Sequence, residues 1–565
     1  MAAMTLTEAA DHVTGTEPQF ALDEATIRGV NYKVFKNTPP HLRAMLHDCK
    51  AMHGGGADDY LVFQNERWSY DAFCAETNRI AHAMSDELGI RPGDRVAIAM
   101  RNYPELLFLM MAISSIGAVV VFLNGWWTTE ELDYALEDSG ATTVFADGPR
   151  RERLLPLVEN RGLRVIGTRD GETHGGLTYS TLRAASTNEA WPEVEIDTDA
   201  DFAIMYSSGT TGHPKGVVQT HRGAISAVYS WLLTLVIAPL MVEPDPDAEP
   251  VEPLKPAVLI VTPLFHVTAT HPMFLLSIPM GAKVAVLYKW DAEEAVRVID
   301  EEKITRFLGV PTQSADLRKA ALRMGSKLAS LQFLGSGGAK RPAPQVAELQ
   351  DTFPNIAIAS GWGMTETNAV GLGIAGPDYN ERPGAAGRLY PPLQKLKILD
   401  DEGNELPNGE VGELTVKSAA NMRCYLNKPE ATDEVLQDGW LRTGDLAMVD
   451  DEGYVTIVDR KKNIIIRGGE NIACLDVEGA IHRHPDVIEA GAFSVPHERL
   501  GEVVGAGIQV RPGSQLTGET LREFLAEHIA SFKIPDHYWF REHALPRGAT
   551  DKTDRRALRA ECLGD

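Results

Sequence analysis

Tyr206-Ser-Ser-Gly-Thr-Thr-Gly-His-Pro-Lys-Gly216 is the most informative stretch of this 565-residue chain. It follows the apolar run Phe202-Ala-Ile-Met205, which predicts a buried strand. Its serines, threonines and glycines offer hydroxyls and backbone N–H groups with little steric cover, and Lys215 adds a positive charge. These groups suit an anion such as a polyphosphate. Gly209 and Gly212 are only three positions apart, which excludes the P-loop spacing. By composition alone, an ordinary surface loop remains the alternative.

Strands alternate with helices on both sides of this loop, through roughly the first 400 residues. Strands are predicted at 95–100, 283–288 and 304–310. Between the last two, Asp291 can cap a helix while the Glu294 side chain reaches back, as in a capping box. The alternation predicts parallel sheets covered by helices.

Two apolar stretches resemble membrane spans. Leu106–Leu123 has 18 residues without a charge, the length at which a membrane helix must be considered. A helix, a turn and a buried strand fit better, because Pro104 and Glu105 suit a first helical turn and Gly117 interrupts the run. Val228–Val242 is too short to span comfortably. We therefore expect no integral membrane span.

From about residue 395 the pattern changes to short strands with tight turns. Asp400–Gly403 and Asp450–Gly453 are turn signals beside predicted strands at 396–399, 412–416 and 454–458. Residues 459–462 form a charged stretch, expected to be solvated, that could join two domains. Roughly a hundred residues follow, enough for a small α/β domain. We predict domains at 1–460 and 461–565.

Composition narrows the class of protein. The net charge is −25 and the pI about 5.1, and a field of that sign repels nucleic acid. The five cysteines are scattered and form no C-x-x-C pair, which favours a reducing, cytoplasmic location over a disulfide scaffold or a zinc site. The first thirty residues lack the apolar core of a signal peptide. Residues 242–256, rich in proline and acid, are expected to form an exposed loop.

The loop at 207–216 resembles the signature loop of the adenylate-forming superfamily, which includes acyl-CoA synthetases, adenylation domains of peptide synthetases and firefly luciferase. Further segments resemble that family's motifs in the family's order. They are Gly335-Ser-Gly-Gly-Ala-Lys340, Gly361-Trp-Gly-Met-Thr-Glu-Thr367, Arg442-Thr-Gly-Asp445, the hinge motif 459–471, and Leu545-Pro-Arg-Gly-Ala-Thr-Asp-Lys552. The likeness covers residues 60 to 558, nearly the whole chain.

The resemblance implies a large N-terminal α/β domain of parallel-rich sheets packed with helices, a small β-barrel-like part, and a small mobile C-terminal α/β domain with its hinge at Lys462. It implies ATP, Mg²⁺ and CoA as ligands. A small-molecule carboxylic acid would attack the α-phosphate of ATP to give acyl-AMP, and CoA would then displace AMP. A homodimer is compatible with this family.

The resemblance also implies the site residues. Glu366 and Thr210 are candidates for the Mg²⁺ site, and Thr365 for phosphate support in catalysis. Trp362 would stack on adenine, Asp445 would accept hydrogen bonds from the ribose, and Arg460 would donate to the same nucleotide. The full candidate nucleotide set is Ser207, Ser208, Gly209, Thr210, Thr211, Gly212, Lys215, Gly338, Ala339, Lys340, Gly361, Trp362, Gly363, Met364, Thr365, Asp445 and Arg460.

Lys552 is the candidate catalytic cation, expected to bridge the substrate carboxylate and the α-phosphate. Asp551 stands beside it where the family has Gly, and its carboxylate could slow adenylation by holding Lys552 away from ATP. Without the family, Lys552 would read as a surface lysine in a basic tail. After the hinge at Lys462, the segment Arg467, Gly468, Gly469 and Glu470 is expected to face the thiol substrate.

The acyl site is the least determined part of the sequence. His266, Trp231 and Gly335 are candidates for its walls, and a core position is the alternative for each. Residues 263–281 contain no acid, which favours an uncharged, apolar tail such as a medium or long fatty acid. Transfer to a carrier protein or an amine instead of CoA is the second reading, and a non-catalytic nucleotide-binding module is the third.

Overall fold

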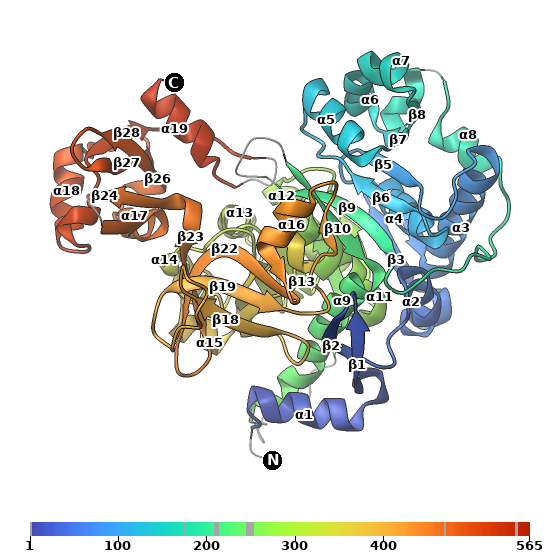
Figure 1. Ribbon diagram of the computed structural model, residues 1–565, viewed down its shortest axis with the longest axis horizontal. Helices are drawn as coiled ribbons and strands as arrows, with labels where there is room; N and C mark the ends of the chain where they lie inside the picture. Colours follow the sequence, from blue (N-terminus) through green and yellow to red (C-terminus); the bar gives the residue numbers. More distant parts are fainter. Residues whose placement is uncertain are drawn as a thin grey trace.

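The computed structural model describes residues 3–174, 176–207, 214–243, 253–467, 470–548 and 552–564. Two large sheets, a smaller antiparallel sheet and a C-terminal α/β unit form the molecule (Figure 1). The N-terminal residues add a helix, α1 (Leu6–Thr16), and a hairpin of β1 (Leu22–Ile27) and β2 (Val30–Phe35). The predicted fold class is confirmed.

The first large sheet carries the phosphate-loop candidate at its edge. Its spatial order is β20 (Cys424–Tyr425), β10 (Lys215–Thr220), β9 (Asp201–Ser207), β6 (Val119–Phe122), β5 (Arg95–Ala99), β7 (Thr143–Ala146) and β8 (Arg164–Gly167). The strands from β9 to β8 are parallel, and β10 runs antiparallel to β9 and β20.

The second large sheet has nine strands. Its order is β17 (Arg388–Leu389), β16 (Leu372–Ala375), β15 (Ala357–Trp362), β14 (Phe333–Ser336), β13 (Arg306–Gly309), β11 (Ala257–Ile260), β12 (Lys283–Val286), β3 (Asp59–Phe63) and β4 (Glu66–Ser69). The six strands from β15 to β3 are parallel, and antiparallel strands close both edges.

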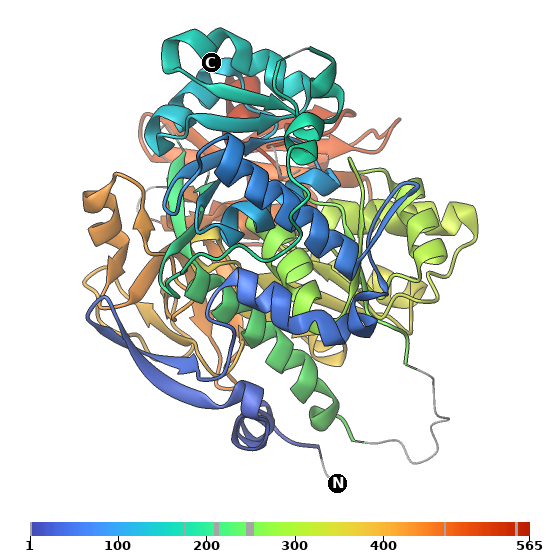
Figure 2. The same ribbon diagram turned by 90° about the vertical axis from the view of Figure 1, so that its right-hand side faces the viewer.

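The main core lies between the two large sheets. Alternate residues of β5 and β11, such as Val96 and Val258, point into it, while their neighbours Ala97 and Leu259 belong to separate outer cores. The central helices are α2 (Leu42–Asp48), α3 (Tyr70–Glu87), α4 (Pro104–Ser115), α9 (His221–Ile237) and α11 (Leu276–Met280). The helices α5 (Thr129–Ser139) and α6 (Gly148–Leu154) belong to the outer layer of the first sheet, and α12 (Ala292–Glu302), α13 (Pro311–Met324) and α14 (Ala343–Thr352) to that of the second (Figure 2).

The apolar stretch 106–123 forms a buried helix and strand, α4 and β6, as predicted. The second apolar stretch is longer than expected, because α9 begins at His221 and continues through a 3₁₀ turn, η5 (Ala238–Met241). In the described part of the chain, this 21-residue segment is the one helix long and apolar enough to cross a membrane, and more than half of it is buried in the protein. All five cysteines are free.

Two local expectations need correction. Asp291 does cap α12, accepting from the backbone of Glu293 and Glu294, but the Glu294 side chain pairs with Arg297 instead of reaching back. The short charged stretch at 459–462 is not solvated throughout, because Asp459 is buried and accepts from the backbone N–H of Leu475. Its burial raises the pKa of this carboxyl. Most of the proline- and acid-rich segment, residues 244–252, lies outside the described residues.

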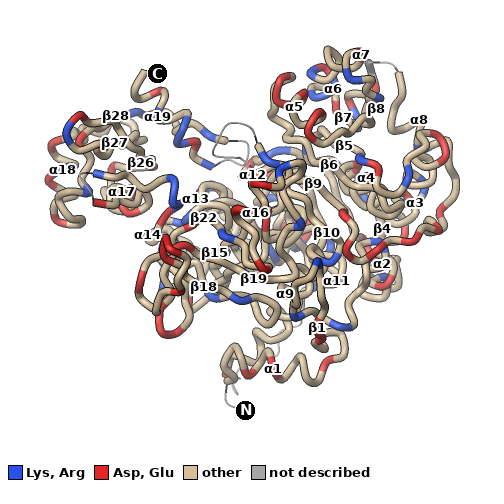
Figure 3. Tube along the Cα trace, in the orientation of Figure 1, with Lys and Arg blue, Asp and Glu red and all other residues tan. Residues whose placement is uncertain are grey.

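The smaller sheet is antiparallel and precedes the C-terminal unit. It contains β18 (Lys395–Leu399), β19 (Gly412–Lys417), β22 (Trp440–Val449), β21 (Leu436–Gln437) and β23 (Val455–Arg460). The turns at 400–403 and 450–453 fall between strands, as predicted. A basic run then leads into the C-terminal unit (Figure 3).

The C-terminal unit has its own sheet and core. Its strands are β25 (Glu470–Ala473), β24 (Ile464–Arg467), β27 (Gly501–Val510), β26 (Val487–His497) and β28 (His537–Arg541). Its helices are α17 (Cys474–Ile481), α18 (Gly518–Ala526) and α19 (Arg555–Leu563). Figure 1 shows this unit on one side of the molecule, with α19 extending back toward the large sheets.

Candidate active site

Lys552 lies directly against the loop that follows β14. An ideal Cβ at Gly338 would lie 2.6 Å from the Lys552 Cε and 2.9 Å from its Nζ. Gly338 also has a φ of +77°, a conformation that residues with a Cβ rarely adopt. The close approach of this C-terminal lysine to the large domain therefore depends on glycine at position 338.

The surroundings of Lys552 are charged and enclosed. Burial, followed by the charge of Arg460, lowers the pKa of Lys552 to about 8, while Asp445 acts in the opposite direction. Arg460 Nε lies 3.0 Å from Asp445 Oδ1, and the two residues are paired across β22 and β23. Lys552 thus lies near Gly338, Asp445 and Arg460, which belong to three other motifs of the sequence.

Asp445 has a second partner. The indole Nε1 of Trp362, at the end of β15, donates a hydrogen bond of 2.7 Å to Asp445 Oδ2. Asp445 is only 3% exposed, so its carboxylate is held in a fixed orientation by Trp362 and Arg460. Stacking of Trp362 on adenine and ribose binding by Asp445 stay predictions.

Glu366 lies in the 3₁₀ turn η7 (Thr365–Thr367) after β15. It is 5% exposed, and its Oε1 accepts a 2.8 Å hydrogen bond from the Tyr425 hydroxyl. The Lys215 ammonium lies 4.7 Å from the centre of the same tyrosine ring. The Gln219 side chain of β10 donates to the Thr365 carbonyl at 2.9 Å. These contacts join the edge of the first sheet to the end of β15.

The phosphate-loop candidate begins and ends at this junction, because Ser207 and Lys215 pair across β9 and β10. The predicted residues Ser208, Gly209, Thr210, Thr211 and Gly212 lie outside the described residues, as do Gly468, Gly469 and Asp551. Gly363 shows why its motif contains glycine, since a Cβ there would lie 2.0 Å from the Ala369 carbonyl oxygen.

A Mg²⁺ ion on a nucleotide commonly uses one or two carboxylates together with the phosphate oxygens. The buried Glu366 carboxylate fits that requirement. No group of three or more metal-ligating side chains occurs among the described residues, so the protein ligands here would be few.

His266 is also near Lys552. It precedes the short helix α10 (Val267–Ala269), and its Nδ1 accepts from the Thr268 backbone at 3.3 Å. Burial, followed by the positive charge of Lys552, lowers the pKa of His266 to about 3. The imidazole is therefore neutral at physiological pH, and Lys552 carries the positive charge of this pair.

The other two acyl-site candidates lie on a helix and a strand. Trp231 is a buried residue of α9, and its ring centre is 6.5 Å from that of Tyr390. Gly335 lies on β14, where a Cβ would meet the Phe333 ring at 2.5 Å and Leu308 at 3.0 Å. Sequence reasoning missed Tyr390 and Phe333. Period-two alternation could have placed Phe333 on the same face as Gly335.

The remaining candidates are more exposed. Lys462 lies in the 3₁₀ turn η8 (Lys461–Asn463), between β23 and the C-terminal sheet. Arg467 donates to the Phe532 carbonyl at 3.2 Å and pairs with Asp536 at 3.2 Å, so its guanidinium is held within the C-terminal unit. Lys340 donates to the Ile457 carbonyl at 3.4 Å. The candidates not yet placed are Ala339, Gly361, Met364 and Glu470, each of which belongs to one of the motifs quoted above. Glu470 is exposed.

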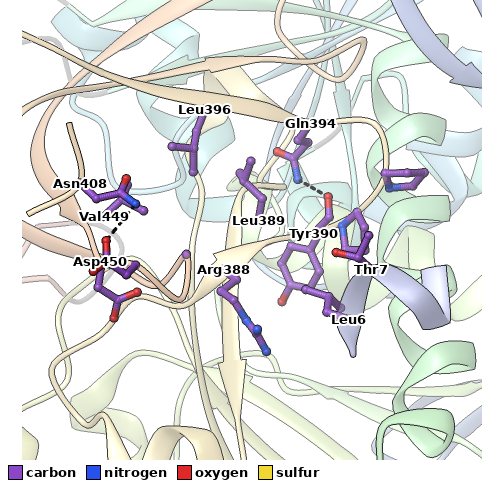
Figure 4. A pocket seen from close by; sticks show the side chains of 14 residues that line it. Leu6, Thr7, Arg388, Leu389, Tyr390, Gln394, Leu396, Asn408, Val449 and Asp450 are labelled. Carbon is purple, nitrogen blue, oxygen red and sulfur yellow. Dashed lines mark hydrogen bonds between the residues drawn. The ribbon is translucent and has the colours of Figure 1, made fainter. Parts of the chain in front are cut away.

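A separate surface depression of about 450 Å³ is shown in Figure 4. It lies between the start of α1, the segment 388–396 and the turn at 449–453, and none of the predicted site residues lines it. Tyr390 lines this depression and is also the aromatic neighbour of the acyl-site candidate Trp231. The Tyr390 carbonyl accepts a hydrogen bond from the Gln394 side chain.

The comparisons with known proteins agree with this arrangement. Residues 50–426 match the family model of the AMP-binding enzyme, and residues 476–552 match the AMP-binding enzyme C-terminal domain. A feruloyl-CoA synthase from an Amycolatopsis species is 32% identical, covering 89% of this chain and 94% of its own. The long-chain-fatty-acid–CoA ligase FadD13 of Mycobacterium tuberculosis is 31% identical, covering 88% and 93%.

Among solved structures, the o-succinylbenzoate CoA synthetase of Bacillus subtilis in complex with its acyl-adenylate intermediate matches with a TM-score of 0.77 and 26% identity. The match covers 91% of this chain and 97% of that one. The fold and the convergent motifs are those of an adenylate-forming enzyme. The chain belongs to the AMP-binding enzyme family, among the acyl-CoA synthetases that form an acyl-adenylate with ATP and transfer the acyl group to CoA.

Proposed function

We propose that this protein activates a carboxylic acid with a bulky apolar body, either a medium or long fatty acid or an aromatic acid, and releases it as the CoA thioester with AMP and pyrophosphate. The buried, acid-free segment around His266 and the aromatic neighbours Trp231 and Tyr390 support an apolar body. The names of the relatives support both kinds of acid, because one acts on ferulate and another on long-chain fatty acids.

The contact between Lys552 and Gly338 carries this proposal. The first step joins two anions, the carboxylate and ATP, so the site must neutralise charge where they meet. We propose that the Lys552 ammonium, which lies beside Asp445 and Arg460, binds both reactants and fixes the line of attack; its contact with Gly338 supports this. The neutral His266 next to it can form the wall of the carboxylate site without competing for the same charge.

The nucleotide would be held by the groups around Asp445 and Glu366. Asp445, oriented by Trp362 and Arg460, is proposed to accept from the ribose hydroxyls. Glu366 is proposed to hold the Mg²⁺ that accompanies the phosphates, and that ion, when bound, neutralises phosphate charge.

The second step needs a thiol where Lys552 now lies. We propose that residues 461–565 rotate about Lys462 between the two steps, so that Lys552 leaves and the Arg467–Glu470 segment approaches the acyl-adenylate. The large domain would then comprise residues 1–460. The 3₁₀ turn η8 between two sheets is a short connection that can absorb such a rotation.

The test is a comparison of the two half-reactions in Lys552→Ala. Acyl-AMP formation, measured as pyrophosphate release, should be abolished, while conversion of supplied acyl-AMP and CoA to thioester should persist. Lys533→Ala is a matched control, because Lys533 pairs with Asp476 inside the C-terminal unit at 2.8 Å. Survival of both half-reactions in Lys552→Ala would remove the proposed role. Pyrophosphate exchange without use of CoA would point to another acyl acceptor, such as a carrier protein.

A further inference from the structure

Arg306 is a cation with no counter-charge among the residues that the structure describes. It begins β13, and its guanidinium carbon lies 4.0 Å from the centre of the Phe333 ring. Its Nε is buried and has no hydrogen-bond partner. Within the described ranges of the chain, neither a carboxylate nor a hydrogen-bond acceptor pairs with the guanidinium. An unpaired charge of this kind is costly to bury, so its presence calls for a partner from outside the chain.

Another arginine, Arg341, shows how a buried guanidinium is usually paired with hydrogen-bond acceptors. Burial lowers the pKa of both Arg306 and Arg341 to about 10, so both remain charged at neutral pH. Arg341 donates to the Gln345 side chain at 2.7 Å, to Ser314 at 3.5 Å and to the Ala359 carbonyl at 3.4 Å. Arg306 is half-buried, and among the described residues it lacks comparable partners apart from the aromatic ring of Phe333.

Arg306 faces the acyl-site neighbourhood. Arg306 and Leu308 alternate with Phe307, which belongs to the outer core, so they point toward the space between the two sheets. Phe333 and Gly335 lie on the same face of the adjacent strand, in register with them. Burial perturbs the pKa of Arg306 strongly, yet its side chain keeps accessible surface.

The opposite wall of this space is aromatic. The phenol of Tyr390 lies close enough to Arg306 for each to shift the pKa of the other, and the Tyr390 ring neighbours Trp231. Tyr390, like Arg306, is half-buried. Arg306 is therefore a cation whose neighbours in the space between the sheets are aromatic and aliphatic.

The strand register indicates how far Arg306 lies from Lys552 at the reacting centre. Arg306 pairs with Phe333, which is five residues before Gly338, the contact of Lys552. At ~3.3 Å per residue the strand covers about 10 Å from Phe333 to its end at Ser336, and Gly338 lies in the loop just beyond. Because both cationic side chains extend into the intervening space, their ligands would be separated by on the order of 10 Å.

We infer that Arg306 binds an anionic group at the far end of the acyl substrate, so that the preferred substrate is a dicarboxylic acid with an apolar body. One carboxylate reacts beside Lys552, and the other forms a bidentate pair with the Arg306 guanidinium. This inference rests on the proposed function. It changes the expectation of an uncharged tail only at the end of that tail, and leaves the body apolar.

The test measures kcat/KM for AMP release with CoA, using α,ω-dicarboxylates from adipate to sebacate, each paired with the monocarboxylate of the same length. The wild type should prefer one of the dicarboxylates over its monocarboxylate. Arg306→Met should lose about 30- to 100-fold on that dicarboxylate and reverse the preference. Arg306→Lys should recover part of the loss. Arg323→Met, at an exposed arginine of α13, should leave the ratio unchanged.

Thermal unfolding separates binding from a structural role. Arg306→Met should unfold at the same or a higher temperature than the wild type, because it removes an unpaired buried charge. A wild-type preference for monocarboxylates at every length, or an unchanged ratio in Arg306→Met, would overturn the inference and leave the proposed function intact. Failure of the wild type to release AMP with any acid would refute both. If Arg306→Met does not fold, the wild-type ratio of kcat/KM for dicarboxylate over monocarboxylate and the same ratio in Arg306→Lys decide whether the inference holds.

Discussion

Replacing Gly338 by alanine tests the contact on which the mechanism depends. The new Cβ would lie 2.6 Å from the Lys552 Cε, whereas ordinary contacts begin at 3.4 Å. Lys552 must therefore move by about 3.4 − 2.6 = 0.8 Å, or the loop must move by a similar amount. A displacement of about 1 Å in a positioned catalytic group can cost roughly 100-fold in rate. We expect acyl-AMP formation to slow by 10- to 100-fold on this order-of-magnitude reasoning.

Backbone strain contributes separately, since alanine in the left-handed region costs about 1–2 kcal/mol. Gly325→Ala measures that contribution alone, because Gly325 has a φ of +68° and nothing lies within 4 Å of its ideal Cβ. Both variants should lose similar stability in thermal unfolding. Only Gly338→Ala should lose adenylation rate.

The assay follows pyrophosphate release during the first turnover, and separately the thioester formed from supplied acyl-AMP and CoA. Gly338→Ala should affect the first measurement and spare the second, in which Lys552 has no proposed part. Equal adenylation rates for the two glycine variants would refute the reasoning, because the lysine would then not need its place against the loop. Equal losses in both half-reactions would indicate general damage to the fold.

Three further outcomes are expected. The value of kcat/KM for ATP in adenylation should fall as pH rises through about 8, because Lys552 loses its proton there; a profile that is flat from pH 7 to 9 would contradict this. Trp362→Phe removes the 2.7 Å hydrogen bond to Asp445 and should raise the KM for ATP about tenfold, by loss of a bond to a charged group worth about 1.5–3 kcal/mol; an unchanged KM would argue against ribose binding by Asp445. Asp551→Gly should give a faster adenylation burst, and a slower burst would reject the idea that this carboxylate holds back Lys552.

Local sequence determined much of the architecture. The charge-free stretch 106–123 became α4 and β6 because Pro104 starts a helix and Gly117 ends the apolar run. The few strands predicted in the two large sheets, such as 95–100 and 283–288, agree with the structure to within a few residues, although the predicted strand at 304–310 begins only at Arg306. These features depend on neighbours in the chain, and periodicity and capping residues report them directly.

Burial of individual charges could not be predicted in the same way. Asp459 lies in a charged run that looks solvated, and it is covered because α17 of the following unit packs beside it. Arg306 looks like any charged residue at the start of a strand. Its surroundings are set by residues distant in sequence, Phe333 and Tyr390, neither of which is a carboxylate. Side-chain environment at such positions depends on elements that are distant in sequence.

The motifs and their order were legible from the sequence, which was sufficient for the class of chemistry and for the candidate residues. Only the tertiary structure decided which of them touch: Lys552 with the Gly338 loop, and Asp445 with both Trp362 and Arg460. Those contacts join the large domain, the antiparallel sheet and the C-terminal unit. No periodic signal encodes them, because they follow from how separately folded layers pack against each other.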